Sequence, residues 1–183
     1  MTAVFDSKWL IALLFAVLVA QVLIREGRRA PPLPLGPAPG TAVPVLTVGR
    51  LDGQPDESLA DLVSIDEGCS LLVVVSPTCP TCARMRTEWP GRFSNWADSV
   101  RAEVRPIWLS EGGEEAFNAF TSGFRLDGIT LTFLLHGTTA HAYSVLGVLG
   151  TPTLYLIDSA GIVQAGLLGN SLPPVDLARS VCR

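Results

Sequence analysis

The sequence has few charged side chains, which make up 16% of its 183 residues, against roughly 25% in typical soluble proteins. The net charge of −4 argues against a nucleic-acid binder, which would need clustered lysine and arginine, so we expect no nucleic-acid partner. The 17 glycines and 14 prolines follow no period, which excludes collagen-like and coiled-coil structures. Four cysteines are too few for a disulfide scaffold of this size. Disorder is excluded as well, because 48% of the residues are apolar.

Part of this apolar excess lies in one run. Residues 9–24 read WLIALLFAVLVAQVLI, with Gln21 as the one polar residue. As a helix this run would span about 24 Å, and Lys8 and Arg25 can extend it toward both interfaces of a roughly 30 Å hydrocarbon core. We therefore expect residues 1–29 to form an uncleaved membrane anchor that contacts the lipid bilayer through residues 9–24. A cleaved signal peptide and a buried helix of a soluble domain are the alternatives.

Residues 30–44 contain six prolines in APPLPLGPAPGTAVP. Proline fixes φ and favours extended polyproline II, so this stretch is typical of a semi-rigid spacer. A disordered linker would have the same consequence. Three arginines directly before the spacer (Arg25, Arg28 and Arg29) favour, by the positive-inside rule, a cytoplasmic side for the domain that follows.

Residues 45–183 are long enough to bury a sizeable core. The apolar run 71–75 predicts a buried central strand, and the patterns around it predict further strands and helices. Expected strands are 104–109, 129–135, 153–158 and 162–168; expected helices are 82–96, which Pro90 kinks or splits, 114–120 and 173–181. Strands that alternate with helices predict an α/β sandwich with a mixed sheet.

The motif Cys79-Pro80-Thr81-Cys82 follows the central strand and begins a helix. A helix N-terminus offers free N–H groups and partial positive charge, which stabilise a thiolate. Pro80 suits the first helical position because its missing N–H is not needed there. The i,i+3 spacing places both sulfurs on one face of the first turn. The motif therefore predicts a redox pair in which Cys79 is the attacking thiolate and Cys82 resolves the mixed disulfide.

Two other interpretations of this motif are open, a zinc site and a static disulfide. Structural zinc usually needs four ligands, and no second pair has ligand spacing. We expect no metal, and we interpret His136 and His141 as loop residues.

A second feature supports the redox interpretation. The stretch 147–158, GVLGTPTLYLID, with the turn at Gly161 and Gly169 after the next strand, resembles the C-terminal half of a thioredoxin domain. The resemblance implies a cis bond between Thr151 and Pro152 beside the cysteine pair. It also implies that the Thr151 backbone binds an extended, cysteine-bearing partner chain.

The resemblance covers residues 45–183, and with the anchor and the SPTCP entry at 76–80 it extends to membrane-anchored thioredoxin-like proteins of the TlpA, cytochrome c maturation and MauD groups. It implies an α/β thioredoxin-like fold, a central mixed sheet flanked by helices, preceded by one transmembrane helix. It further implies an extracytoplasmic, periplasmic-side domain and a protein substrate that contacts Pro80 and Thr81. Finally, the resemblance implies a membrane-embedded electron donor or acceptor and no bound cofactor. It favours a reductive role.

The sequence departs from the family pattern around Cys82. Met85 stands where TlpA-like proteins often carry Glu, and Val73 stands where thioredoxin has a buried acid. The proton acceptor for Cys82 is therefore unidentified. Glu88 is one candidate, although a solvated helix residue is the favoured interpretation.

The other two cysteines, Cys69 and Cys182, fall in a thioredoxin topology at the end of the sheet opposite the cysteine pair. We favour two unpaired, partly buried thiols. A structural disulfide is the alternative. For the whole chain, the alternative to a thiol–disulfide oxidoreductase is a non-catalytic assembly or scaffold subunit of a membrane complex.

Overall fold

A computed structural model describes residues 17–18, 21, 36–50, 55–110, 115, 119–120, 132–135 and 139–183. The chain divides into two compact units, Met1–Leu33 and Pro34–Arg183. In the first unit the described residues are Val17, Leu18 and Gln21, which are helical. Most of the expected anchor at 9–24 lies outside the described residues, and among those described there is no helix with the length and apolarity to cross a bilayer.

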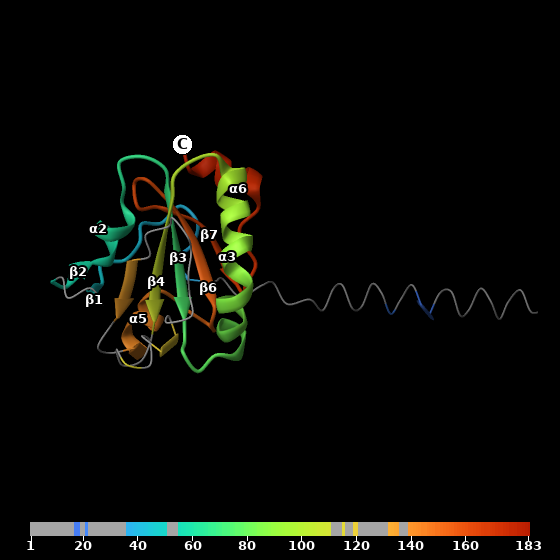
Figure 1. The fold of residues 1–183 in the computed structure, drawn as a ribbon, viewed down its shortest axis with the longest axis horizontal. Coiled ribbons are helices and arrows are strands. Elements are labelled where there is room, and N and C mark those ends of the chain that lie inside the picture. The colour runs from blue at the N-terminus through green and yellow to red at the C-terminus, as the bar shows by residue number, and fades with distance from the viewer. Residues whose placement is uncertain are drawn as a thin grey trace, which may run out of the picture. The chain divides into compact units, whose positions relative to one another are not determined.

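In the second unit, seven described strands form one mixed sheet in the order β2-β1-β5-β4-β3-β6-β7 (Figure 1). Strands β3, β4 and β5 are parallel, and β6 and β7 continue the sheet antiparallel on the other side of β3. The strands are β1 Thr47–Arg50, β2 Glu57–Ser58, β3 Cys69–Val75, β4 Val104–Ser110, β5 Thr132–Leu135, β6 Thr153–Asp158 and β7 Val163–Leu168. The helices are α2 Leu59–Val63, α3 Pro80–Val100, α5 Thr139–Val145 and α6 Val175–Val181.

Strand β3 lies at the centre, and all seven of its residues are buried. Side chains alternate across a strand, so Leu71 and Val73 join one core and Leu72 and Val74 the other. The first core packs against α3 and α6, and the second packs against α2 and α5. The predicted α/β sandwich with a mixed sheet is confirmed.

Helix α3 runs through Pro90 as one helix of 21 residues, so the expected split does not occur. Proline removes one helical hydrogen bond, but a buried apolar stripe on each side of it holds the helix to the sheet. That stripe consists of Cys82, Met85, Trp89, Phe93, Trp96 and Val100.

Strand β4 includes a proline, Pro106. Pro106 pairs with Leu71 of β3, whereas the pairing with β5 begins only at Ile107. Its missing N–H is therefore tolerated at the start of the strand. Of the expected helix 114–120, residues 115, 119 and 120 are described, and these are helical.

The folded unit begins before residue 45, the expected start of the domain. We call residues 36–43 the strap. Gly40 N–H donates to the Val163 carbonyl at 2.7 Å, and Val163 N–H donates to the Thr41 carbonyl at 2.8 Å. Val43 is buried. The last part of the expected spacer thus packs on the domain, because its non-proline residues keep N–H groups for pairing.

Candidate functional site

The cysteine pair lies where the carboxyl end of β3 turns into α3. Cys79 is the residue before the first turn of α3, in extended conformation, and Pro80 takes the first helical position. The turn is held by Cys79 N–H, which donates to the Ser76 carbonyl at 3.0 Å. The Cys82 N–H donates to the Cys79 sulfur at 3.3 Å. The free N–H groups of the helix end therefore point at the Cys79 sulfur.

The pKa values of the two thiols are shifted in opposite directions. Partial burial pushes the pKa of Cys79 upward, but hydrogen bonds from Cys82, from the Thr151 side chain and from the Thr81 backbone outweigh burial and bring this pKa below its ordinary value. Cys82 is fully buried, and desolvation together with the neighbouring Cys79 raises its pKa to about 12. Cys79 is thus the thiol that ionises, and Cys82 stays protonated near neutral pH.

The Thr151–Pro152 segment lies directly against the cysteine pair. The Cys79 thiol donates to the Thr151 carbonyl with a sulfur–oxygen distance of 3.1 Å, although the two residues are 72 positions apart. The Thr151–Pro152 peptide bond is cis. The Pro152 carbonyl accepts from Gly169 N–H at 2.8 Å, which fixes the segment to the end of β7.

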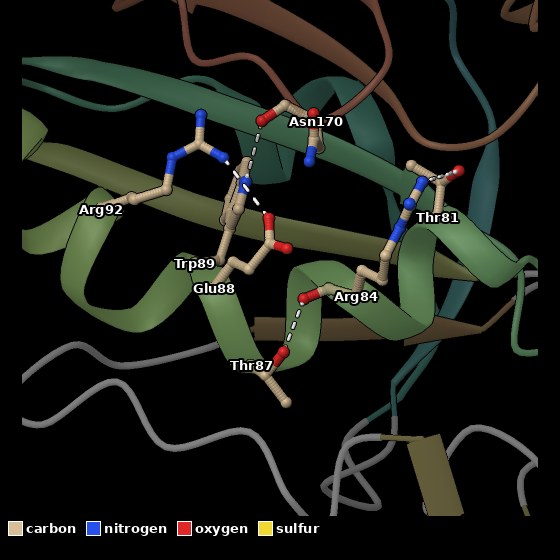
Figure 2. A network of polar contacts seen from close by, with 7 residues as sticks. All are labelled: Thr81, Arg84, Thr87, Glu88, Trp89, Arg92 and Asn170. Atoms are coloured by element: carbon tan, nitrogen blue, oxygen red, sulfur yellow. Dashed lines mark hydrogen bonds and ion pairs between the residues drawn. The ribbon is translucent and has the colours of Figure 1, made fainter.

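Polar contacts line the exposed side of α3 near the site (Figure 2). Thr81 accepts from Arg84 Nη2 at 3.4 Å. The Glu88 carboxylate points at Arg92, 3.8 Å from its guanidinium, and both side chains are 47% exposed. Glu88 is therefore a solvated helix residue, as favoured, and it does not serve as a buried proton acceptor for Cys82.

No protein-family model and no curated protein matches the sequence. Solved structures match it in shape. The thioredoxin domain of thiol-disulfide oxidoreductase BVU-2223 from Bacteroides vulgatus has a TM-score of 0.58 and 19% identity, covering 79% of this chain and 96% of its own. A secreted disulfide oxidoreductase of Mycobacterium tuberculosis has a TM-score of 0.52 and 15% identity, covering 75% of this chain and 93% of its own.

BsSco, a member of the Sco family of cytochrome c oxidase assembly proteins, gives a TM-score of 0.55 at 18% identity, covering 77% of this chain and 91% of its own. This chain has a thioredoxin-like fold. The structural neighbours include thioredoxin-like disulfide oxidoreductases.

At the opposite end of the thioredoxin-like sheet, Cys69 and Cys182 form a disulfide, with their Cα atoms 4.6 Å apart. Both are buried. The favoured expectation of two unpaired thiols is wrong. Cys182 follows α6, whose Ala178 packs in the same core as β3, and this packing brings the chain end to the first residue of β3.

Tyr143 is a supporting residue of the thioredoxin-like site that the sequence interpretation missed. Its hydroxyl donates to the Val75 carbonyl at 2.8 Å, which joins α5 to the last residue of β3. The buried pair Ala142 and Leu146, at i,i+4 spacing, was the available signal for a helix here. His141 lies in this helix, so its interpretation as a loop residue is wrong, and His136 lies outside the described residues.

Proposed function

We propose that this chain is a membrane-anchored thiol–disulfide oxidoreductase that exchanges disulfides with a cysteine-containing protein partner, in the maturation of a cytochrome or another extracytoplasmic enzyme. One observation carries this function. The Cys79 sulfur is partly exposed, has a lowered pKa, and lies at both a helix N-terminus and the Thr151 carbonyl. A reactive cysteine needs this combination of access and thiolate stabilisation.

In the reductive direction, the Cys79 thiolate attacks one sulfur of a partner disulfide. The Cys79–partner S–S bond forms, the partner S–S bond breaks, and the released partner thiolate takes a proton from water. The lowered pKa of Cys79 provides more thiolate for this step than an ordinary cysteine would at the same pH.

Cys82 then loses its proton to solvent and attacks the Cys79 sulfur. The second partner thiolate leaves and takes a proton from water, so the partner has gained two electrons from the chain and two protons from solvent, and Cys79–Cys82 is a disulfide. In the mixed disulfide Cys79 carries no charge and no longer accepts the hydrogen bond as a thiolate. Two of the three causes that raise the pKa of Cys82 are then removed, and burial remains.

The partner chain would lie along Thr151 and Pro152, as the resemblance implies, next to the exposed Pro80 and the half-buried Thr81. Leu149 and Leu168 offer large apolar side chains close to this segment, with 57% and 54% of their surface exposed. Leu168 pairs with Thr153 in the sheet, so it lies one residue from Pro152 along the strand register. Such exposed apolar side chains beside a reactive thiol suit contact with a protein substrate.

An extracytoplasmic location on the periplasmic side is supported by the Cys69–Cys182 disulfide, because structural disulfides persist in oxidising compartments. The apolar run 9–24 would hold the domain at the membrane, where a membrane-embedded donor would restore the dithiol. One relative of the fold is a secreted oxidoreductase.

The function is tested by trapping. Cys82→Ser protein keeps the attacking thiolate and loses the resolving thiol, so we expect it to accumulate a covalent complex with a partner that reductant releases. Cys79→Ser is the matched control and should trap nothing. Failure of Cys82→Ser to form any mixed disulfide with a protein disulfide would contradict the proposal.

The redox potential of the pair separates this function from a scaffold with a static disulfide. We expect a potential in the range of exchange-active proteins, whereas a value below about −300 mV would favour the scaffold subunit. Equilibration with glutathione buffers and mass analysis of the alkylated protein measures it.

A further inference from the structure

The strap reaches the loop that carries Thr151. Gly36 N–H donates to the Gly147 carbonyl at 3.1 Å. Gly147 is the second residue of the connection between α5 and β6, and Thr151 lies four residues further along it. The chain that enters the folded unit therefore touches the same loop that contacts the Cys79 sulfur.

This contact leaves no room for a side chain on either partner. Gly147 has φ +58°, and a Cβ added there would lie 2.7 Å from Gly36 Cα. Gly36 has φ +66°, and a Cβ there would collide with the Tyr155 hydroxyl and ring. Two left-handed glycines thus let the backbones close on each other above Tyr155.

Tyr155 connects the Gly36–Gly147 contact to the loop between α5 and β6. It is buried, and its hydroxyl donates to the Leu146 carbonyl at 2.8 Å. Burial raises the pKa of Tyr155 to about 12, so the hydroxyl keeps its proton near neutral pH. The start of the loop is therefore clamped between Gly36 and Tyr155.

The far end of the loop is held separately. Thr153 Oγ1 donates to the Gly150 carbonyl at 2.6 Å, and Gly169 N–H donates to the Pro152 carbonyl at 2.8 Å. Thr151 lies between the two attachments, and its carbonyl faces the Cys79 sulfur at 3.1 Å. If the contact between Gly36 and Gly147 were lost, this end of the loop would no longer be fixed. The distance between the Thr151 carbonyl oxygen and the Cys79 sulfur would then be held from one side only.

We propose, building on the proposed oxidoreductase function, that Gly36, the first residue of the strap, is a positioning residue of the catalytic site. By clamping Gly147 against Tyr155, Gly36 holds the Thr151 segment in register with the Cys79 sulfur. The segment between the N-terminal unit and the domain is then part of the support of the site as well as a spacer.

Two alanine substitutions in the full-length chain test this. Gly36→Ala and Gly40→Ala both place a side chain at a left-handed glycine of the strap. Only Gly36→Ala meets Tyr155, since no heavy atom lies within 4 Å of a Cβ at Gly40. Gly40→Ala therefore matches the backbone strain without disturbing the loop.

The readouts are the pH profile of Cys79 alkylation by iodoacetamide and the rate constant of exchange with glutathione disulfide. Cys82 is the titratable group that acts on Cys79 among the described residues, and it is unchanged in both variants. Because a hydrogen bond of the Thr151 side chain contributes to the low pKa of Cys79, displacement of Thr151 in Gly36→Ala should move the alkylation profile to higher pH and slow exchange by roughly threefold to tenfold. Gly40→Ala should stay within about twofold of the wild type.

Equal profiles and rates for Gly36→Ala and Gly40→Ala would overturn the inference and leave the strap a simple tether. Should Gly36→Ala fail to fold, Tyr155→Phe keeps the ring and removes only the bond to Leu146, and we expect a smaller change in the same direction. A wild-type profile for Tyr155→Phe would then overturn the inference. A wild-type chain that does not react with glutathione disulfide would instead overturn the proposed function, and this inference with it.

Discussion

Cys79 and Cys82 are three residues apart, yet they occupy different electrostatic environments. The Cys79 sulfur receives hydrogen bonds at the open end of α3, whereas Cys82 faces the core beneath the first turn. The proposed roles of Cys79 in attack and of Cys82 in resolution rest on this difference, because the thiolate is the attacking form of a cysteine.

We expect iodoacetamide at neutral pH to modify Cys79 and spare Cys82 in the reduced protein. Cys79 should reach half-modification below pH 9.0, its ordinary value, because its lowered pKa gives thiolate at lower pH. Cys82 should resist until the pH approaches about 12. Peptide mass analysis across a pH series measures both, and similar profiles for the two thiols would contradict these environments.

Cys79→Ser provides a matched control at this scale. The substitution removes the Cys79 contributions that raise the pKa of Cys82, while burial still opposes ionisation. Cys82 should therefore become modifiable at a lower pH than in the wild type.

At the scale of elements, α3 is joined to the end of the domain by two indole groups. Trp89 Nε1 donates to the Asn170 carbonyl at 3.2 Å, which Figure 2 shows, and Trp96 Nε1 donates to the Pro173 carbonyl at 2.7 Å. These bonds tie the helix that carries the cysteine pair to the segment between β7 and α6.

Trp96→Phe should lower the free energy of unfolding by about 1–3 kcal/mol, because the buried Pro173 carbonyl loses its donor and the core loses volume. Denaturant titration measures the change. Arg92→Ala is the contrasting variant on the same helix. It removes an exposed ion pair with Glu88, so its effect should stay within about 0.5 kcal/mol, and a comparable loss in both variants would contradict the importance of the indole bond.

The sequence predicted those elements whose patterns are local. The β-branched run of β3, the cysteine motif at the start of α3 and the β6–β7 hairpin each carry their own signal within a few residues. By contrast, α5 and the strap depend on contacts with distant residues. The strap, for example, is held by Val163 and Gly147, which lie more than 100 residues away.

The same limit applies to the candidate site. The cysteine spacing indicated the chemistry, whereas the approach of Thr151 to Cys79 came only from a family resemblance. Nothing in the sequence showed the support by Tyr143 or Tyr155, because each hydroxyl bonds a backbone carbonyl that only the tertiary fold brings within reach.

For the whole molecule, the Cys69–Cys182 disulfide closes a loop across 113 residues and so spans most of the folded unit. We expect the double variant Cys69→Ala, Cys182→Ala to lose up to about 4–5 kcal/mol of unfolding free energy by the chain-entropy model. Its exchange through Cys79 should persist. The matched control is the double variant Cys79→Ala, Cys82→Ala, which should lose exchange while its unfolding free energy falls much less. Equal destabilisation of the two double variants in a denaturant titration would argue against a structural role for Cys69–Cys182.

The membrane side of the domain is a further prediction at this scale. A C-terminal reporter that is active only outside the cytoplasm should give signal when fused to the full-length chain, as the proposed location and the structural disulfide require. A reporter that is active only in the cytoplasm should stay silent. The reverse pattern would follow the three arginines after the apolar run and contradict the proposed location.

Cys69 begins the buried strand β3, whereas the Cys79–Cys82 pair lies beyond the other end of this strand. The strand rises about 20 Å from Cys69 to Val75, and attack on a disulfide requires two sulfurs in contact. Inside the folded chain the reactive thiolate is thus insulated from the Cys69–Cys182 bridge. In the proposed exchange cycle, the Cys79–Cys82 pair would therefore be oxidised and reduced without exchange with the Cys69–Cys182 disulfide.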